Sequence, residues 1–225
     1  RMVEAAGTVG LNIAFSRGYV AGDESFHDLP DFRPVIASTE SENVDAFLIA
    51  DELPRAAKVI LDLRSLGMMQ PIIGSDYLDS PRLINLAGQA ARDVYVTSAI
   101  NPDSPVAAFR EFKTRFTQRF GAPPSYAATQ GFETMILLYN AILASNSTNS
   151  LAIANRLRTV QSWNGLFDPF RFSAGGGIEC RDIYIKVADV PNARFSTVLT
   201  KRPDGVSTPF VYEPYSQKPC ALPNK

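Results

Sequence analysis

Short apolar segments alternate with helical patterns over the first hundred residues of this chain. Four segments have the length and composition of buried strands, namely 9–15, 44–50, 70–74 and 93–99. Between the last three of them, apolar residues recur at three- and four-residue steps over 54–67 and 80–88, which predicts two helices. Each helix begins at a Pro or a Ser and ends at a Gly. This β-α-β-α-β order predicts an α/β fold with a parallel sheet.

After residue 99 the pattern changes to longer helical segments. We predict three helices there, at 104–121, 125–144 and 150–160. The first of them carries four phenylalanines on one stripe, which we interpret as core: Phe109, Phe112, Phe116 and Phe120.

Strand patterns return after the helices. Residues 169–190 read as two strands joined through a turn at Gly175–Gly177, and 194–199 as another strand. Five prolines between 200 and 225 indicate an extended tail. We therefore expect three parts: an α/β unit at 1–98, helices and closing strands at 99–198, and a Pro-rich extended tail at 199–225.

The charge balance argues against nucleic acid and membrane surfaces as partners. The chain of 225 residues has 22 Lys and Arg against 23 Asp and Glu, so it has no field that would collect phosphate groups or anionic lipid. No apolar run reaches the roughly 20 residues that span a bilayer. Residues 1–10 lack the layout of a signal peptide, which could have been removed with whatever preceded Arg1.

Few residues suit catalysis, a cofactor or a metal ion. His27 is the only histidine, and it lies in a polar segment with no nucleophile-bearing turn nearby. The glycines at 175–177 are not followed by the Gly-Lys-Ser or Gly-Lys-Thr of a phosphate-binding loop. The sequence therefore predicts a protein that is not an enzyme and that has no cofactor and no metal site.

Acidic residues follow two of the predicted strands directly. Asp51 and Glu52 come after the strand at 44–50, and Ser75, Asp76 and Tyr77 come after the next strand. Ligands of parallel α/β sheets collect where strands end and helices begin, so these side chains are candidates for one crevice. The structural alternative is that Asp51 or Glu52 caps the following helix, and that Asp79 or Ser80 caps the helix after it.

Several ordered segments of the chain resemble one known family. They are "PIIGSD", "LINLAG", "VYVTS", "FKTRFTQRFG" and "GLFDPFRFSAGG", and the likeness extends over roughly residues 1–198. The chain resembles the extracellular solute-binding proteins of branched-chain amino acid ABC transporters, which are type I periplasmic binding proteins of the Leu/Ile/Val-binding kind. The resemblance implies two Rossmann-like lobes that close on a ligand, export to the periplasm or cell exterior, and an ABC permease as the membrane partner.

The resemblance also assigns roles to the acidic strand ends. It implies that Asp76 holds the ammonium group of an amino acid ligand, with Ser75 and Tyr77 beside it, and that Asp51 and Glu52 form a second wall. Glu52 stands where an aromatic residue is more usual in the family. Two acids in one crevice suit a cationic, polyamine-like or amide-bearing ligand, unless one acid stays solvated.

Family members are substantially longer than this chain. The resemblance implies that the chain begins inside the second lobe and lacks most of the first, to which the later helices and last strands would return. Three functions are therefore considered: the substrate-binding component of an ABC importer for amino acids or similar solutes, the ligand-sensing domain of a receptor with the same fold, and, more remotely, an enzyme acting on a small amide or amino acid.

Cys180 and Cys220 are the two cysteines of the chain, and they are either bridged or unrelated thiols. Their spacing fits no zinc or redox motif, and the Pro-rich segment before Cys220 favours a bridge in an exported protein. Closing this loop of about 40 residues would stabilise the fold by ~4 kcal/mol. We expect neither thiol to react with a thiol reagent in the native protein without reductant. Reaction of both, or Cα atoms more than ~7 Å apart, would contradict the bridge.

Overall fold

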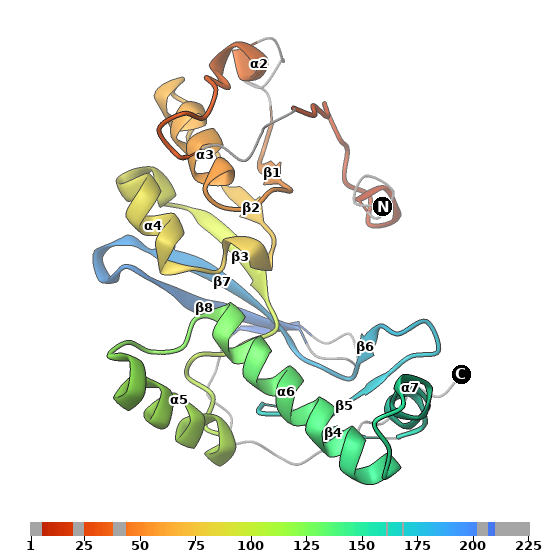
Figure 1. The fold of residues 1–225 in the computed structure, drawn as a ribbon. Helices are drawn as coiled ribbons and strands as arrows, with labels where there is room; N and C mark the ends of the chain where they lie inside the picture. The colour runs from red at the N-terminus through yellow and green to blue at the C-terminus, as the bar shows by residue number, and fades with distance from the viewer. Residues whose placement is uncertain are drawn as a thin grey trace. The chain divides into compact units, whose positions relative to one another are not determined.

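The computed structural model describes residues 6–19, 25–37, 44–160, 162–167, 169–201 and 207–209. Figure 1 traces them from the N-terminus in red to the C-terminus in blue. The chain divides into two compact units, which are described separately: unit 1 contains 1–96 and 187–196, and unit 2 contains 97–186 and 197–225. The roles expected for 1–98, 99–198 and 199–225 as lobes and tail stay predictions.

Parallel strands form the first half of a sheet, as the sequence predicts. Strands β1, β2 and β3 pair in parallel, with Phe47 opposite Ile72 and Ile72 opposite Val94. Among the described residues the strand order is β1-β2-β3-β7-β8-β9, and β8 pairs with β9 in antiparallel fashion. The bounds of these strands are β1 Phe47–Ile49, β2 Ile72–Gly74, β3 Val94–Ser98, β7 Ile183–Asp189, β8 Arg194–Lys201 and β9 Ser207–Pro209.

The two helices predicted in unit 1 are confirmed, and they lie side by side (Figure 1). They are α3 (Arg55–Ser65) and α4 (Pro81–Ala87). In α4 the Ser80 side chain accepts a hydrogen bond from the Arg82 amide, and Gly88 ends the helix with a φ of +54°. Shorter helical elements are α2 Arg33–Ala37, η2 Asp76–Leu78, η3 Gly88–Ala91 and η4 Val190–Asn192.

One buried cluster holds unit 1 together. It joins the inner faces of α3 and α4 to the strands, and its fully buried members include Ile60, Ile72, Leu78, Leu83, Val94 and Val96. At the opposite end of the sheet from the acidic turns, the Arg64 guanidinium donates hydrogen bonds to the carbonyls of Met68, Gln70, Ala90 and Arg92. A group with five donors suits this position, because two backbone segments meet there, the one between α3 and β2 and the one between α4 and β3.

Unit 2 contains the three predicted helices and a small antiparallel sheet. The helices are α5 Ala107–Phe120, α6 Tyr126–Ser145 and α7 Ser150–Thr159, and the strands are β4 Trp163–Asn164, β5 Pro169–Phe172 and β6 Ile178–Glu179. Phe109 and Phe112 of α5 are buried, as predicted, and Phe116 packs against them. Phe120 is 61% exposed, so the predicted core stripe is wrong at its last member, where the helix ends.

The predicted strand at 9–15 is wrong. Residues 9–10 form a turn, 11–19 have no regular secondary structure, and Leu11 is exposed. A strand needs a neighbour for its backbone hydrogen bonds, and in the described part of the chain β1 is the edge strand and pairs only with β2. Alternating apolar residues were therefore not sufficient to make a strand here.

The turn at Gly175–Gly177 is confirmed, but the strand after it is not continuous. The Ser173 amide donates to the Gly177 carbonyl at 2.8 Å, and this turn joins β5 to the short β6. The chain then bends and begins β7 separately, so 169–190 contains three strands where two were predicted. Within the predicted tail, 207–209 pair with β8, whereas Cys220 lies outside the described residues and its bridge to Cys180 stays a prediction.

Gly74 is required by the close approach of Leu78, and its replacement tests the geometry of the turn after β2. A Cβ atom at Gly74 would lie 2.5 Å from Cδ1 of Leu78, which is fully buried. We expect Gly74→Ala to lower the free energy of unfolding by about 1–3 kcal/mol, as overpacking does, measured by urea denaturation. Gly131→Ala in α6 is the matched control, because nothing lies within 4 Å of its added Cβ. Equal stability of the two variants would contradict this packing.

Candidate functional site

The carboxyl ends of β1 and β2 lie next to each other. The parallel register places Ile49 opposite Gly74, so the segments that leave the two strands emerge at the same edge of the sheet. Each segment then begins a helical element, α3 or η2. This edge is where ligands of parallel α/β sheets bind, and it is the edge at which the sequence places the acidic residues.

An open pocket of about 440 Å³ lies between these two segments. It is lined by Ala50, Asp51, Glu52, Arg55, Ser75 and Tyr77, all of which belong to unit 1. The structure therefore brings together four of the five side chains predicted for the site. The fifth, Asp76, is not among the lining residues.

Asp51 is held by neighbours within the protein. The Arg55 guanidinium donates from Nη2 to Oδ1 of Asp51 at 2.9 Å, and the Tyr19 hydroxyl donates to Oδ2. The Glu52 amide donates to Oδ1 at 2.8 Å. The side chain of Asp51 is only 12% exposed, so its oxygens accept hydrogen bonds mainly from groups of unit 1.

The pKa values of these groups reflect the same contacts. Partial burial would raise the pKa of Asp51, but hydrogen bonds from Arg55, Tyr19 and the Glu52 amide outweigh it and hold the pKa below its ordinary value. Hydrogen bonding to Asp51 raises the pKa of Arg55. Burial, together with donation to Asp51, raises the pKa of the Tyr19 phenol. At neutral pH the group is therefore an ionised pair with a neutral phenol.

Glu52 is more available than Asp51. Its side chain is 59% exposed, and Oε1 forms an ion pair with Nη2 of Arg55 at 3.2 Å. Tyr77, across the pocket, is also largely exposed. The alternative role of Asp51 or Glu52 as a helix cap would require a hydrogen bond from an amide of the first turn of α3 to one of these side chains. The N-terminus of α3 has no such side-chain cap, so the capping alternative is wrong for both residues.

Asp76 begins the 3-10 helix η2 and is partly buried. Its backbone carbonyl accepts from the Asp79 amide at 3.0 Å, which fixes the turn that follows β2. Ser75 precedes it in extended conformation and makes no side-chain cap bond. Ser80 caps α4, so the structural alternative is correct for that residue.

Sequence reasoning missed two residues of the site, Arg55 and Tyr19. Arg55 could have been found, because it lies four positions after Asp51 at the start of a predicted helix, the spacing of a helical ion pair. Tyr19 gave no comparable signal. Its ring packs on Phe32 with centroids 4.6 Å apart, and only the fold brings it to Asp51, 32 residues later.

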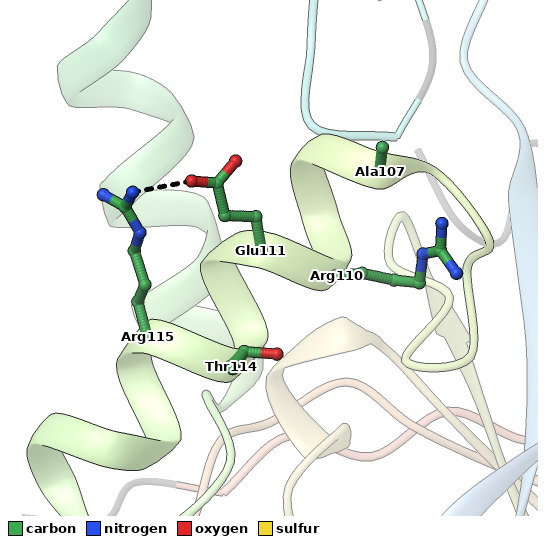
Figure 2. A pocket seen from close by; sticks show the side chains of 5 residues that line it. All are labelled: Ala107, Arg110, Glu111, Thr114 and Arg115. Atoms are coloured by element: carbon green, nitrogen blue, oxygen red, sulfur yellow. Dashed lines mark ion pairs between the residues drawn. The ribbon is translucent and has the colours of Figure 1, made fainter.

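A second hollow, of about 420 Å³, lies on the outer face of α5 in unit 2. Figure 2 shows its lining side chains, which all come from this one helix. Its ion pair, Arg115 to Glu111 at 2.7 Å, joins two largely exposed side chains one turn apart. These features are typical of a solvated helix surface, and we assign no function to this hollow.

Neither a metal site nor a membrane span is found in the described ranges. No three His, Cys, Asp or Glu side chains there come together in a group that could hold a metal ion. Likewise, within the same ranges, each helix is too short or too polar to cross a membrane.

Replacing Asp51 with Asn tests whether its charge stabilises unit 1. Because Asn keeps the shape and loses the ion pair, we expect the free energy of unfolding at pH 7 to fall by about 1–2 kcal/mol, the range of a hydrogen bond to a charged group that is partly exposed. The folded pKa of Asp51 is depressed. The difference between the two proteins should therefore be present above about pH 4, the ordinary Asp value, and should be lost as the pH falls through the lower folded pKa.

Urea denaturation at several pH values between 7 and 2 measures this difference. Tyr19→Phe is the companion variant, because it removes one donor to Asp51 and keeps the ring on Phe32. A difference between Asp51→Asn and the unchanged protein that persists in acid would show that shape, not charge, is responsible.

Several proteins of similar sequence or fold are named as amino acid-binding proteins. A Leu/Ile/Val/Thr-binding protein of Salmonella typhimurium is 27% identical over 94 residues, which are 42% of this chain and 24% of that protein. The fold is similar to that of a leucine-binding protein of Thermotoga maritima, with a TM-score of 0.69 and 23% identity over 78% of this chain and 50% of that one. It is also similar to the leucine-, isoleucine-, valine-, threonine- and alanine-binding protein of Brucella ovis in its closed conformation, with a TM-score of 0.73 and 18% identity over 90% and 53% of the two chains.

The chain thus spans about half the length of these solved structures. The sequence model described as "Periplasmic binding protein" matches residues 4–189, which is most of the chain. The family is one of binding proteins and not of enzymes, which agrees with the prediction from sequence. The parallel strands β1, β2 and β3 and the α/β fold are those expected for this family. The chain belongs to the periplasmic binding protein family.

Proposed function

We propose that this chain is part of the substrate-binding component of an ABC importer for amino acids or similar small solutes. Its membership of the periplasmic binding protein family supports this proposal, as do the names of the relatives with similar sequence and fold. The observation that carries it is the pocket in which Asp51, Glu52, Ser75 and Tyr77 face one another at the carboxyl edge of the sheet. An exported location, a cleft between two lobes and contact with permease subunits belong to the same proposal.

The charge of the site favours a ligand with an ammonium group. Asp51 and Arg55 form a pair within the wall, so the residues that line the pocket carry one net negative charge. Asp76 adds a second carboxylate directly after Ser75. The α-ammonium of an amino acid needs one carboxylate, so an ordinary amino acid fits this site if the other acid stays solvated.

Glu52 and Asp76 are the two candidates for the contact with the ammonium group. Glu52 lines the pocket and is exposed, but it lies beside the Arg55 guanidinium, which competes for the same oxygens. Asp76 lies one residue beyond Ser75 in the turn that forms the other wall, and it is partly buried. A carboxylate that is partly shielded from water makes the stronger charge-assisted hydrogen bond, so we assign the main contact to Asp76 once the ligand is enclosed.

Asp76→Asn and Glu52→Gln in the full-length product of the gene test this assignment. Each substitution keeps the shape of the side chain and removes its charge. A charge-assisted hydrogen bond is worth about 1.5–3 kcal/mol, so we expect Asp76→Asn to weaken binding of leucine or isoleucine by about ten- to a hundredfold, measured by calorimetry. Glu52→Gln should weaken binding less.

Thermal unfolding without ligand separates binding from stability. Both variants should melt close to the unchanged protein if the carboxylates serve the ligand. A lower melting temperature with unchanged affinity for Asp76→Asn would mean that its carboxylate only stabilises its own turn, and a larger loss for Glu52→Gln would assign the contact to the other wall.

The second candidate function is a sensory domain that uses the same fold. Deletion of the gene distinguishes the two, because loss of labelled leucine uptake supports the importer. Unchanged uptake together with a lost cellular response to the amino acid supports the sensor. Absence of binding to any amino acid by the full-length protein would overturn both.

A further inference from the structure

The ion pair between Glu52 and Arg55 leaves one donor group and one acceptor atom open in the wall of the pocket. Arg55 donates from Nε and Nη2 to Asp51, and from Nη2 also to Oε1 of Glu52 at 3.2 Å. Within the part of the chain that the structure describes, Nη1 of Arg55 and Oε2 of Glu52 have no hydrogen-bond partner. A guanidinium nitrogen can only donate and a carboxylate oxygen can only accept. The pair therefore presents both kinds of hydrogen-bonding group to a ligand.

The lining of this pocket is poor in aliphatic side chains. Its residues are Ala50, Asp51, Glu52, Arg55, Ser75 and Tyr77, of which Tyr77 is the only large side chain with an apolar body. Pockets that bind apolar groups are lined mainly by hydrophobic side chains. An aliphatic ligand side chain would cover the open donor and acceptor without replacing their hydrogen bonds to water, which costs affinity. The lining therefore disfavours a branched-chain side chain.

Charge disfavours two other kinds of ligand side chain. A cationic side chain can bind to Glu52, but the guanidinium of Arg55 beside it carries the same charge as the ligand. An anionic side chain can bind to Arg55, but it meets the carboxylate of Glu52. A carboxamide has no net charge, and it has both a carbonyl oxygen that accepts and an NH₂ group that donates. It is the side-chain group that matches the open atoms of both residues.

We propose that the Glu52–Arg55 pair binds a carboxamide of the ligand, so that amide-bearing amino acids are the preferred substrates. The carboxamide oxygen accepts a hydrogen bond from Nη1 of Arg55, and the NH₂ group donates to Oε2 of Glu52. Asp51 is a positioning residue, because its bonds to Nε and Nη2 orient the guanidinium. This inference rests on the proposed function, and it leaves the ammonium group of the ligand to Asp76.

Titration of four amino acids into the full-length product of the gene tests this substrate class by calorimetry. Asparagine and glutamine carry the carboxamide on side chains of two lengths, glutamate has the shape of glutamine with a negative charge, and leucine has neither group. A hydrogen bond to a charged group changes affinity by about ten- to a hundredfold. We expect the better of the two amides to bind about tenfold or more tightly than both glutamate and leucine.

The possible results separate this inference from the proposed function. If neither amide binds about tenfold more tightly than leucine and glutamate, the carboxamide site is wrong, while binding of leucine still supports a binding protein for amino acids. If no amino acid binds, both the carboxamide site and the proposed function are wrong.

Glu52→Met gives an independent measurement, because it removes the acceptor and keeps a side chain of similar length. We expect it to weaken binding of the preferred amide by about ten- to a hundredfold and to leave binding of leucine nearly unchanged, since leucine makes no hydrogen bond to Oε2. Glu111→Met is the matched control. Glu111 is 63% exposed and pairs with Arg115, much as Glu52 is 59% exposed and pairs with Arg55, but it lies in unit 2, away from this pocket.

The control variant should change neither affinity. An unchanged affinity of Glu52→Met for the amide would overturn the carboxamide site. An equal loss for the amide and for leucine would also overturn it, because Glu52 would then contact the ammonium group that all amino acids share.

Discussion

The parallel register of β1 and β2 is the constraint on which the candidate site depends. With Ile49 opposite Gly74, the two strands end together, and the side chains that follow them face one pocket. If the pairing of β2 with β1 were shifted by one residue, the two faces of β2 would be exchanged and its buried Ile72 would face solvent. Gly74 adds a second condition, because Leu78 occupies the space that a Cβ atom would need. Leu78 is fully buried in the core of unit 1. Its packing there therefore fixes the position of the turn that carries Asp76 and Tyr77.

The wall formed after β1 contains its own counter-ion. Asp51 accepts hydrogen bonds from both Arg55 and Tyr19, and its carboxylate stabilises the charge of the guanidinium. Such a group contributes to stability and also sets the charge that a ligand meets. One carboxylate within the wall is neutralised before any ligand arrives, which is why counting acids in the sequence overstates the negative charge of the pocket.

Local signals predicted much of the fold and only part of the site. The cap at Ser80 and the end of α4 at Gly88 follow from side-chain chemistry within a few residues, and the acidic strand ends follow from strand order. The strand at 9–15 failed because pairing depends on a distant neighbour that the pattern cannot reveal. Tyr19 was missed for the same reason, since its partner lies 32 residues away. Phe120 fits the helical stripe but lies at the end of α5, where no core remains to cover it.

The two units differ in how much of their apolar surface they bury by themselves. Unit 1 has one continuous cluster that includes both helices and all three parallel strands, which is what a self-sufficient domain requires. Among its described residues, unit 2 has two smaller clusters and leaves large apolar side chains of α6 exposed, such as Met135 and Leu143. The pocket at the carboxyl ends of β1 and β2 is lined by residues of unit 1 alone. Its geometry is therefore set within the unit that has the more continuous core.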